Sequence, residues 1–243
     1  MEKNAENGKI KKNDFIEIEF TAKIKESGEI FDTNVKESAK KASFQINEEG
    51  LKPFILSVGN SMIIKGLDLA LEGKKIGEKD KFEFSPEDAF GKRNPQLIKM
   101  IPLRIFTEQK IMPEKGMQLT LDGMLVRIVA VTGGRVLADF NNPLAGKTVI
   151  YEVFIKRIVT DLKEKINALQ EFFFKKIFDS EISESKKEVM FKIPKENFQL
   201  EPLIKFYEKP FKEILGFEIK TELIKEKDKK EDKKEEGDKN KTL

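Results

Sequence analysis

The sequence predicts an α+β protein, and three observations support this fold class. Apolar and polar residues alternate with a period of two over 15–22, which indicates a strand with one buried face. One short amphipathic stretch, 66–72, is spaced as a helix within the first part of the chain. Helical spacing returns after Asp161 and is followed by further strand patterns. Strands with a few short helices are therefore expected throughout.

Composition limits the chemistry that this chain can perform. It has 243 residues with 39% hydrophobic content, enough for one large domain or two modest ones. It has no histidine and no cysteine, which excludes Ser-His-Asp and Cys-His catalysis, disulfides, and zinc sites built on those residues. Neither a signal sequence nor a membrane-spanning apolar run is visible, so we expect a soluble cytoplasmic protein without a cofactor or metal.

The elements of the first part follow one another in short steps. Residues 1–9 are polar and are expected to be flexible, and residues 34–50 form a polar surface loop or a short helix. A turn at 26–29 follows the first strand, and the chain resumes at 30–33. Period and composition predict strands at 14–22, 54–58 and 81–84, with the short helix at 66–72.

Residues 92–139 differ in character, because prolines and glycines punctuate short runs there. The pairs Asp122-Gly123 and Gly133-Gly134 are hairpin signals that separate strands at 117–121, 125–131 and 136–139. A long strand over 148–158 could return to the first sheet. We therefore expect a small, mainly β domain, called the insert (92–139), between two strands of a larger domain (10–91 plus 140–160).

A third region begins at Asp161, whose spacing from Glu164 fits a capping box. The pattern predicts a helix after Asp161, a strand at 188–193, a helix at 202–215 and a strand at 217–224, an α+β unit that we call the C-terminal unit (161–224). Pro210 should interrupt or kink the second helix. Residues 225–243 are nearly all Lys, Glu and Asp and are expected to be a disordered tail.

The segments 58–67 and 85–91 carry the main functional signal. They contain no strong acid, base or nucleophile, and their small, aliphatic and aromatic residues have the order that lines an apolar peptide pocket. Together with other short motifs they form an ordered set: Phe31-Asp32, Phe54, Ile63-Ile64-Lys65-Gly66-Leu67, Ala89-Phe90-Gly91 and Pro143-Leu144-Ala145-Gly146. This set resembles the FKBP-type peptidyl-prolyl cis-trans isomerases.

The resemblance implies a specific architecture and activity. The insertion after Phe90-Gly91 is similar to the SlyD-like branch, which carries a chaperone insert-in-flap domain there, and the added C-terminal unit is similar to the long archaeal FKBPs. The implied fold is an FKBP-like antiparallel sheet with a short helix, an inserted mainly β domain and a C-terminal α+β domain. The implied activity is rotation of X–Pro bonds in unfolded or nascent proline-containing polypeptides, with chaperone activity from the insert.

By resemblance, particular residues would line the pocket. Leu67 would lie under the proline ring, the Ile64 backbone N–H would hold a substrate carbonyl, and Asp32 would be the lone polar wall group. Phe20, Asp32, Ile64, Phe90 and Tyr151 are thus the candidate catalytic residues, and Phe31, Phe54, Ile63 and Leu67 the candidate substrate-binding residues.

The chain departs from the family pattern at four of these positions. Phe20 and Phe90 stand where the family often has tyrosines, and Leu67 stands where eukaryotic members often have tryptophan. Tyr151 stands where phenylalanine is usual, so it returns one hydroxyl. We expect this hydroxyl to hydrogen-bond to Asp32.

Other interpretations stay open. The lone phenylalanines fit a strand core, and Asp32 fits a turn. In the insert, an apolar segment either covers the small sheet or forms an adaptable surface for unfolded clients. Its candidate residues are Ile98, Met100, Ile101, Leu103 and Phe106, with Ile105 and Met112 nearby.

The C-terminal unit and the overall charge leave further choices. Phe172, Phe173, Phe174 and Phe178 exceed one helical face, so they form a core, a partner surface or a homodimer contact. The net charge of +3 indicates a solvated surface rather than nucleic-acid binding. A holdase or assembly module with little isomerase activity is the alternative function.

Overall fold

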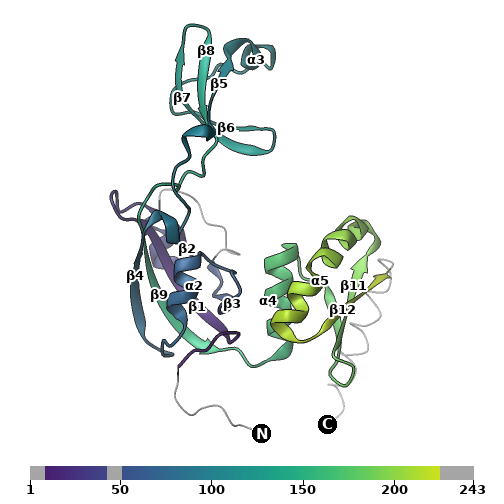
Figure 1. Ribbon diagram of the computed structural model, residues 1–243. Coiled ribbons are helices and arrows are strands. Elements are labelled where there is room, and N and C mark those ends of the chain that lie inside the picture. Colours follow the sequence, from purple (N-terminus) through teal and green to yellow (C-terminus); the bar gives the residue numbers. More distant parts are fainter. Residues whose placement is uncertain (1–8, 43–50, 225–243) are drawn as a thin grey trace.

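The structure is a computed structural model that describes residues 9–42 and 51–224 (Figure 1). The predicted flexible N-terminus, apart from Lys9, and the charged tail lie outside the described residues. In chain order the helices and strands are β1 (Phe15–Ile24), β2 (Ile30–Thr33), α1 (Lys36–Ala39), β3 (Phe54–Ser57), α2 (Lys65–Leu71), β4 (Lys79–Phe84), β5 (Ile98–Pro102), α3 (Leu103–Glu108), β6 (Gln118–Leu121), β7 (Met124–Thr132), β8 (Arg135–Asp139), β9 (Val149–Ile158), α4 (Leu162–Phe174), β10 (Asp179–Ser183), β11 (Glu188–Pro194), α5 (Glu201–Leu215) and β12 (Glu218–Ile224). The 3-10 helices whose bounds lie within the described residues are η2 (Pro86–Asp88), η3 (Pro95–Leu97) and η4 (Lys195–Leu200).

The first sheet has five antiparallel strands in the order β2-β1-β9-β4, with β3 also paired to β1. β9 lies between β1 and β4, although the chain from Ser85 to Thr148 separates β4 from β9. The prediction that the strand after Thr148 returns to the first sheet is therefore confirmed. The α+β fold class is confirmed as well.

The alternation in β1 explains which face of this sheet is covered. Ile16, Ile18, Phe20 and Ala22 are buried, and α2 lies over the same core through its fully buried Leu67 and Leu71. Period-two burial on one face is the physical reason that the sequence pattern predicts this strand. Burial of Phe15 and Thr21 on the other face goes beyond the one-sided strand that the alternation predicted.

A second sheet has the order β5-β8-β7-β6 and its own small core of Phe106, Val126, Ile128, Val136 and Ala138. Figure 1 shows it well separated from the first sheet. Both predicted hairpins are present, with positive φ at Asp122 (49°) and Gly123 (76°) and at Gly133 (56°) and Gly134 (75°). Two successive positive φ values are what a tight hairpin turn between twisted strands requires.

Two elements of the insert, β5 and α3, were not predicted from the sequence. Pro102 is the last residue of β5 and the N-cap of α3, so the strand passes directly into the helix. Both elements are too short to show a hydrophobic period of their own. The prediction that Phe106 belongs to an exposed client surface is wrong. Its side chain is 1% exposed, because α3 turns it into the core of the second sheet.

The two connections between the sheets are bonded to each other. Asn94 donates its backbone N–H to Asn141 Oδ1 (2.8 Å), and Asn141 Nδ2 donates to the Asn94 carbonyl (3.0 Å). Closer to the first sheet, Gly146 N–H donates to the Gly91 carbonyl (2.8 Å). These bonds hold the outgoing and returning segments side by side where they leave the first sheet.

The C-terminal unit contains a third sheet, in the order β10-β11-β12. β11 and β12 are parallel and α5 connects them, as a parallel pair requires. β10 was not predicted, because its polar sequence Asp-Ser-Glu-Ile-Ser has no apolar alternation. Pro210 was expected to interrupt or kink the second helix, and an interruption is excluded because α5 continues through it. Phe206, whose carbonyl loses the proline N–H partner, is largely exposed, so water can bond to that carbonyl.

The surplus of phenylalanines in α4 has a packing explanation. Phe174 and Phe178 are buried, and Phe173 stacks on Tyr207 of α5 with ring centroids 4.5 Å apart. Ile166 and Leu169 of α4 belong to the same continuous core as the buried face of β1. In Figure 1, α4 lies beside β3. None of the described helices is long and apolar enough to cross a membrane.

Candidate functional site

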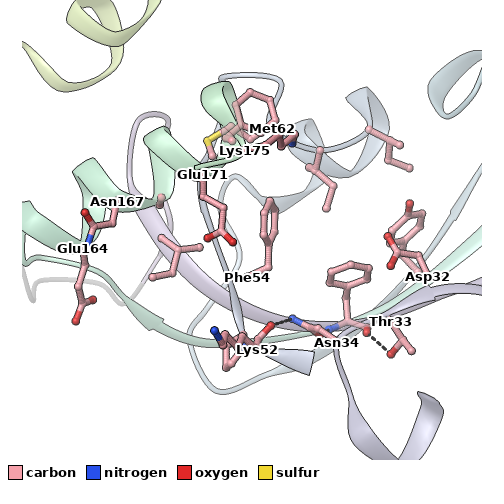
Figure 2. A pocket seen from close by; sticks show the side chains of 18 of the residues that line it. Asp32, Thr33, Asn34, Lys52, Phe54, Met62, Glu164, Asn167, Glu171 and Lys175 are labelled. Atoms are coloured by element: carbon pink, nitrogen blue, oxygen red, sulfur yellow. Dashed lines mark hydrogen bonds between the residues drawn. The ribbon is translucent and has the colours of Figure 1, made fainter. Parts of the chain in front are cut away.

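A cavity of about 720 Å³ opens between the first sheet and α4 (Figure 2). Seven separate parts of the chain surround it. Its lining residues are Phe20, Asp32, Thr33, Asn34, Lys52, Pro53, Phe54, Ile55, Met62, Ile63, Ile64, Phe90, Tyr151, Glu164, Asn167, Ala168, Glu171, Phe172 and Lys175. The set includes all five candidate catalytic residues and two of the four candidate substrate-binding residues.

Strand register brings the polar end of this cavity together. Ala22 of β1 pairs with Asp32 of β2 on one side and with Tyr151 of β9 on the other. Directly opposed residues point to the same face of a sheet, so Asp32 and Tyr151 flank one small alanine. Phe20, two residues before Ala22, shares that face and stacks on Tyr151 with centroids 6.0 Å apart.

Phe31 supports the cavity from outside rather than lining it. Its ring packs edge-on against Phe90 (centroids 5.6 Å apart) and against Tyr151 (6.0 Å). Edge-to-face contacts at these distances are favourable and orient the rings. Phe31 therefore fixes two of the lining aromatics, which differs from the direct substrate contact that the resemblance implied.

Ile63 and Ile64 form the lip of the cavity where the chain enters α2. The loop that precedes them is held by Asp68 of α2. Its buried carboxylate accepts hydrogen bonds from the backbone N–H groups of Gly59 (2.7 Å) and Ser61 (2.8 Å). Outside helices and strands, none of the backbone hydrogen bonds between described residues is donated by the Ile64 N–H. This donor thus has no partner in the surrounding loop.

Leu67 lies below the cavity and does not line it. Its side chain is fully buried in the core beneath Ile63 and Ile64, and it is absent from the cavity lining. Its helical position, three residues after Ile64, turns it toward the sheet. Leu67 shapes the floor from below without touching the open volume.

Asp32 and Tyr151 influence each other electrostatically. Asp32 lies at the open mouth of the cavity, yet partial burial raises the pKa of its carboxyl, with an opposing hydrogen bond from the Thr33 backbone. Burial, and secondly the Asp32 charge, raise the pKa of the Tyr151 hydroxyl above its usual range. A direct hydrogen bond between the two was expected, but the described side chains make none.

Asn34 is a cavity residue that the sequence did not reveal. Its Oδ1 accepts from the Phe20 N–H (2.7 Å), and its Nδ2 donates to the carbonyls of Ile18 (3.0 Å) and Lys52 (3.2 Å). Figure 2 shows the bond to Lys52. These bonds tie β1 to the segment that leads into β3. The only sequence signal was a polar residue directly after the strand 30–33.

The wall supplied by α4 was also missed. Figure 2 shows Glu164, Asn167, Glu171 and Lys175 on this helix, with Asp32 at the opposite end of the cavity. Amphipathic spacing predicted the helix but gave no information about which element its second face would meet. Phe54 and Ile55 of β3, predicted as a buried strand, stay only half-buried because they border this open volume.

The arrangement suits binding of an apolar chain better than acid–base or metal chemistry. Away from α4, the ionisable side chains that line the cavity are Asp32, Lys52 and Tyr151. The pKa of the Tyr151 hydroxyl is raised, so this group stays protonated. Within residues 9–42 and 51–224 no group of three or more Asp or Glu side chains could hold a metal ion. Apolar and aromatic walls with few polar groups are typical of small-ligand and peptide sites.

Comparison with known proteins shows which family the chain belongs to. Residues 6–107 match the FKBP-type peptidyl-prolyl cis-trans isomerase family, and residues 99–144 match the family described as FKBP26, IF domain. A short-type peptidyl-prolyl cis-trans isomerase of Methanocaldococcus jannaschii is 30% identical over 149 residues, which span 61% of this chain and 94% of that protein. This chain belongs to the FKBP-type peptidyl-prolyl cis-trans isomerase family.

Bacterial relatives extend the assignment of this FKBP-type chain. An FKBP-type 16 kDa peptidyl-prolyl cis-trans isomerase of Escherichia coli is 34% identical over 112 residues, 44% of this chain and 74% of its own length. The SlyD isomerase of Aeromonas hydrophila is 28% identical over 153 residues, 62% of this chain and 65% of that protein. Both family-matched ranges of the FKBP-type chain end before α4.

Proposed function

We propose that this FKBP-type isomerase accelerates X–Pro rotation in unfolded or partly folded polypeptides at the cavity beside β1, β2 and β9. The observation that carries the proposal is the convergence of Phe20, Asp32, Ile64, Phe90 and Tyr151 on one apolar volume. These residues come from distant parts of the sequence, and the family relationship supplies the reaction.

The chemistry of such a site follows from amide resonance. Rotation faces a barrier of about 18–20 kcal/mol because the planar amide has partial double-bond character. The planar form carries more charge separation than the twisted form, so a dry apolar cavity stabilises the twisted form relative to the planar one. Uncatalysed isomerisation takes tens of seconds or longer, so a modest stabilisation already matters during folding. A proton donor or acceptor is unnecessary.

We assign the roles in the site accordingly. Phe20, Phe90 and Tyr151 exclude water around the proline, and Ile63 with Phe54 completes the apolar wall. The Ile64 N–H, which has no partner in its own loop, holds a substrate carbonyl and so fixes one side of the rotating bond. Asp32 is the acidic residue of the cavity wall away from α4. There it faces the nitrogen of the X–Pro amide.

We further propose that the chain divides as its sequence suggested, with an isomerase domain (10–91 plus 140–160), the insert (92–139) and the C-terminal unit (161–224). The insert delivers clients. Its exposed side chains include Met100 (59% exposed) and Met112 (73%), together with Met124 and Leu125. Flexible methionines suit the binding of varied apolar segments. Among the candidates that the sequence predicted, Ile98, Ile101 and Leu103 are half-buried and contribute less.

A refolding reaction limited by prolyl isomerisation tests both parts. Full-length protein is compared with a 92–139 deletion and with a Met100→Ser/Met112→Ser variant, whose buried insert core is untouched. We expect acceleration by the full-length protein and a clear loss of acceleration in the deletion and the double variant. On a short proline peptide all three should act equally, because that substrate needs no delivery.

The outcomes separate the alternatives. If none of the three proteins accelerates either substrate, the holdase or assembly function remains and the isomerase proposal fails. If the double variant equals the full-length protein on the refolding substrate, the exposed methionines are not the client surface. If the deletion also loses activity on the short peptide, the insert is part of the isomerase site itself.

A further inference from the structure

The C-terminal unit borders the cavity directly. Six residues of α4 and its C-terminal cap line it, opposite the β3 and α2 side of the isomerase domain: Glu164, Asn167, Ala168, Glu171, Phe172 and Lys175. In Figure 2, Glu171 points from α4 toward the side of the cavity where Phe54 lies. Both family-matched ranges end by residue 144, so this wall lies outside the matched sequence.

The position of α4 is fixed by several independent contacts. Asp161 caps the helix by accepting from the Glu164 N–H (2.8 Å). Arg157 at the end of β9 bonds both Glu17 of β1 (2.6 Å) and Glu164 of α4 (2.8 Å). Beneath these polar contacts, Ile166 is fully buried in the core that α4 shares with the first sheet. The wall is therefore built into the fold.

The cavity is also larger than one prolyl residue needs. Its volume of about 720 Å³ is in the range of sites that hold drug-sized ligands, about 300–1,000 Å³. Most of the proposed proline-binding residues cluster at the end near Asp32 and Tyr151, and Phe54 lies between this end and α4 (Figure 2). The other end lies between Phe54 and Ile55 on β3 and the half-buried Phe172 and small Ala168 on α4.

We propose that Phe172 and Ala168 of α4, with Phe54 and Ile55, form an accessory subsite for a bulky apolar side chain that flanks the X–Pro bond. The inference rests on the proposed function, because the subsite is continuous with the isomerase cavity. It predicts that this chain selects proline segments from apolar, unfolded sequence. The C-terminal unit then sets substrate preference, while the first sheet supplies the rotation chemistry.

Charge contributes less than apolar contact to this subsite. Glu164 is already paired with Arg157, and the Lys175 ammonium lies 5.4 Å from the centroid of the Phe172 ring. Glu171 and Lys52 stand at the rim and are exposed. Exposed ion pairs are screened and weak, so the enclosed aromatic and aliphatic surface decides which side chain binds. The cation over Phe172 also helps to hold that ring at the cavity wall.

The test uses the full chain and two proline peptides that differ only in their flanking residues, one with phenylalanine at the flanks and one with glycine. Rates are measured by NMR exchange between the cis and trans forms. The variants are Phe172→Ala, the conservative Phe172→Leu, and Phe206→Ala as a control on the same unit. Phe206 is 73% exposed on α5 and does not line the cavity.

We expect kcat/KM of Phe172→Ala to fall roughly ten-fold for the phenylalanine-flanked peptide and to stay unchanged for the glycine-flanked one. Phe172→Leu should recover most of the loss, and Phe206→Ala should equal the unmodified protein on both peptides. An equal fall on both peptides, or no fall on either, overturns the subsite. If the unmodified protein accelerates neither peptide, the proposed isomerase function itself fails.

Discussion

At the scale of single residues, the site depends on one alanine flanked by two side chains that carry oxygen. Ala22 pairs with Asp32 and with Tyr151, and its methyl group leaves room for both to reach the cavity. Asp32 and Tyr151 were predicted as site residues through the family resemblance. Their common neighbour is visible only in the sheet register, because β2 and β9 meet β1 from opposite sides.

Replacement of Asp32 by asparagine should change stability in a pH-dependent way. Burial raises the pKa of the folded carboxyl above its ordinary value of 3.8, so folding disfavours the charged form. Below about pH 3.8 the carboxyl is protonated in both states, and this penalty is absent. As pH rises through the folded pKa the penalty appears, so the variant should gain stability relative to the unmodified protein and keep the gain at pH 7.

Denaturant unfolding between pH 3 and pH 7 measures this difference. Asp179→Asn, at an exposed position on β10, is the matched control for the removal of one carboxylate. Carboxylates common to all three proteins cancel in the comparison. A pH-independent difference for Asp32→Asn would show that its carboxyl is not desolvated in the folded protein.

At the scale of elements, α2 is held unusually close to the segment that carries Phe90. A Cβ atom built on Gly66 would lie 2.6 Å from Phe84 Cδ1 and 2.9 Å from the backbone oxygen of Asp88. From the sequence, Gly66 could be read as an ordinary helix start. The structure gives it a packing role, because η2 runs against the first turn of α2. Through this contact the helix positions both the Ile64 lip and the Phe90 wall.

Gly66→Ala should therefore destabilise the protein by about 1–3 kcal/mol, the usual cost of overpacking. In an unobstructed helix the same change would stabilise by up to about 1 kcal/mol, so the sign of the effect is diagnostic. Lys65→Ala, at the adjacent exposed helical position, is the control and should change stability by less than about 0.5 kcal/mol. Thermal and urea unfolding give both values. A stabilised Gly66→Ala protein would contradict the close approach.

Elements also show where prediction from the sequence succeeds and where it fails. The long strands β1 and β9 and the two hairpins of the insert were predictable, because burial on one face and positive φ leave local patterns. β10 is polar, and β5 and α3 are short and joined at Pro102, so these three elements have no recognisable local pattern in the sequence. Asn34 and the α4 wall depend on partners distant in sequence, which no local pattern encodes.

At the scale of the whole molecule, the two additions to the first sheet are attached in different ways. The insert has a separate core around Phe106 and Ile128 and is joined through two mutually bonded connections. The C-terminal unit shares one continuous core with the first sheet, from Ile16 through Ile166 to Phe191. An independent insert suits a mobile client holder, whereas a fused C-terminal unit suits a fixed wall of the cavity.

This difference predicts how the molecule unfolds. Ile166 and Ile128 are matched, since both are fully buried isoleucines, one in each core. Ile166→Ala should cost about 2–5 kcal/mol and lower amide hydrogen-exchange protection in β1 and β11 together. Ile128→Ala should lower protection in β7 and β8 and leave β1 unchanged. If Ile166→Ala lowers protection only within the C-terminal unit, the shared core is not cooperative, and α4 can separate from the cavity that it is proposed to wall.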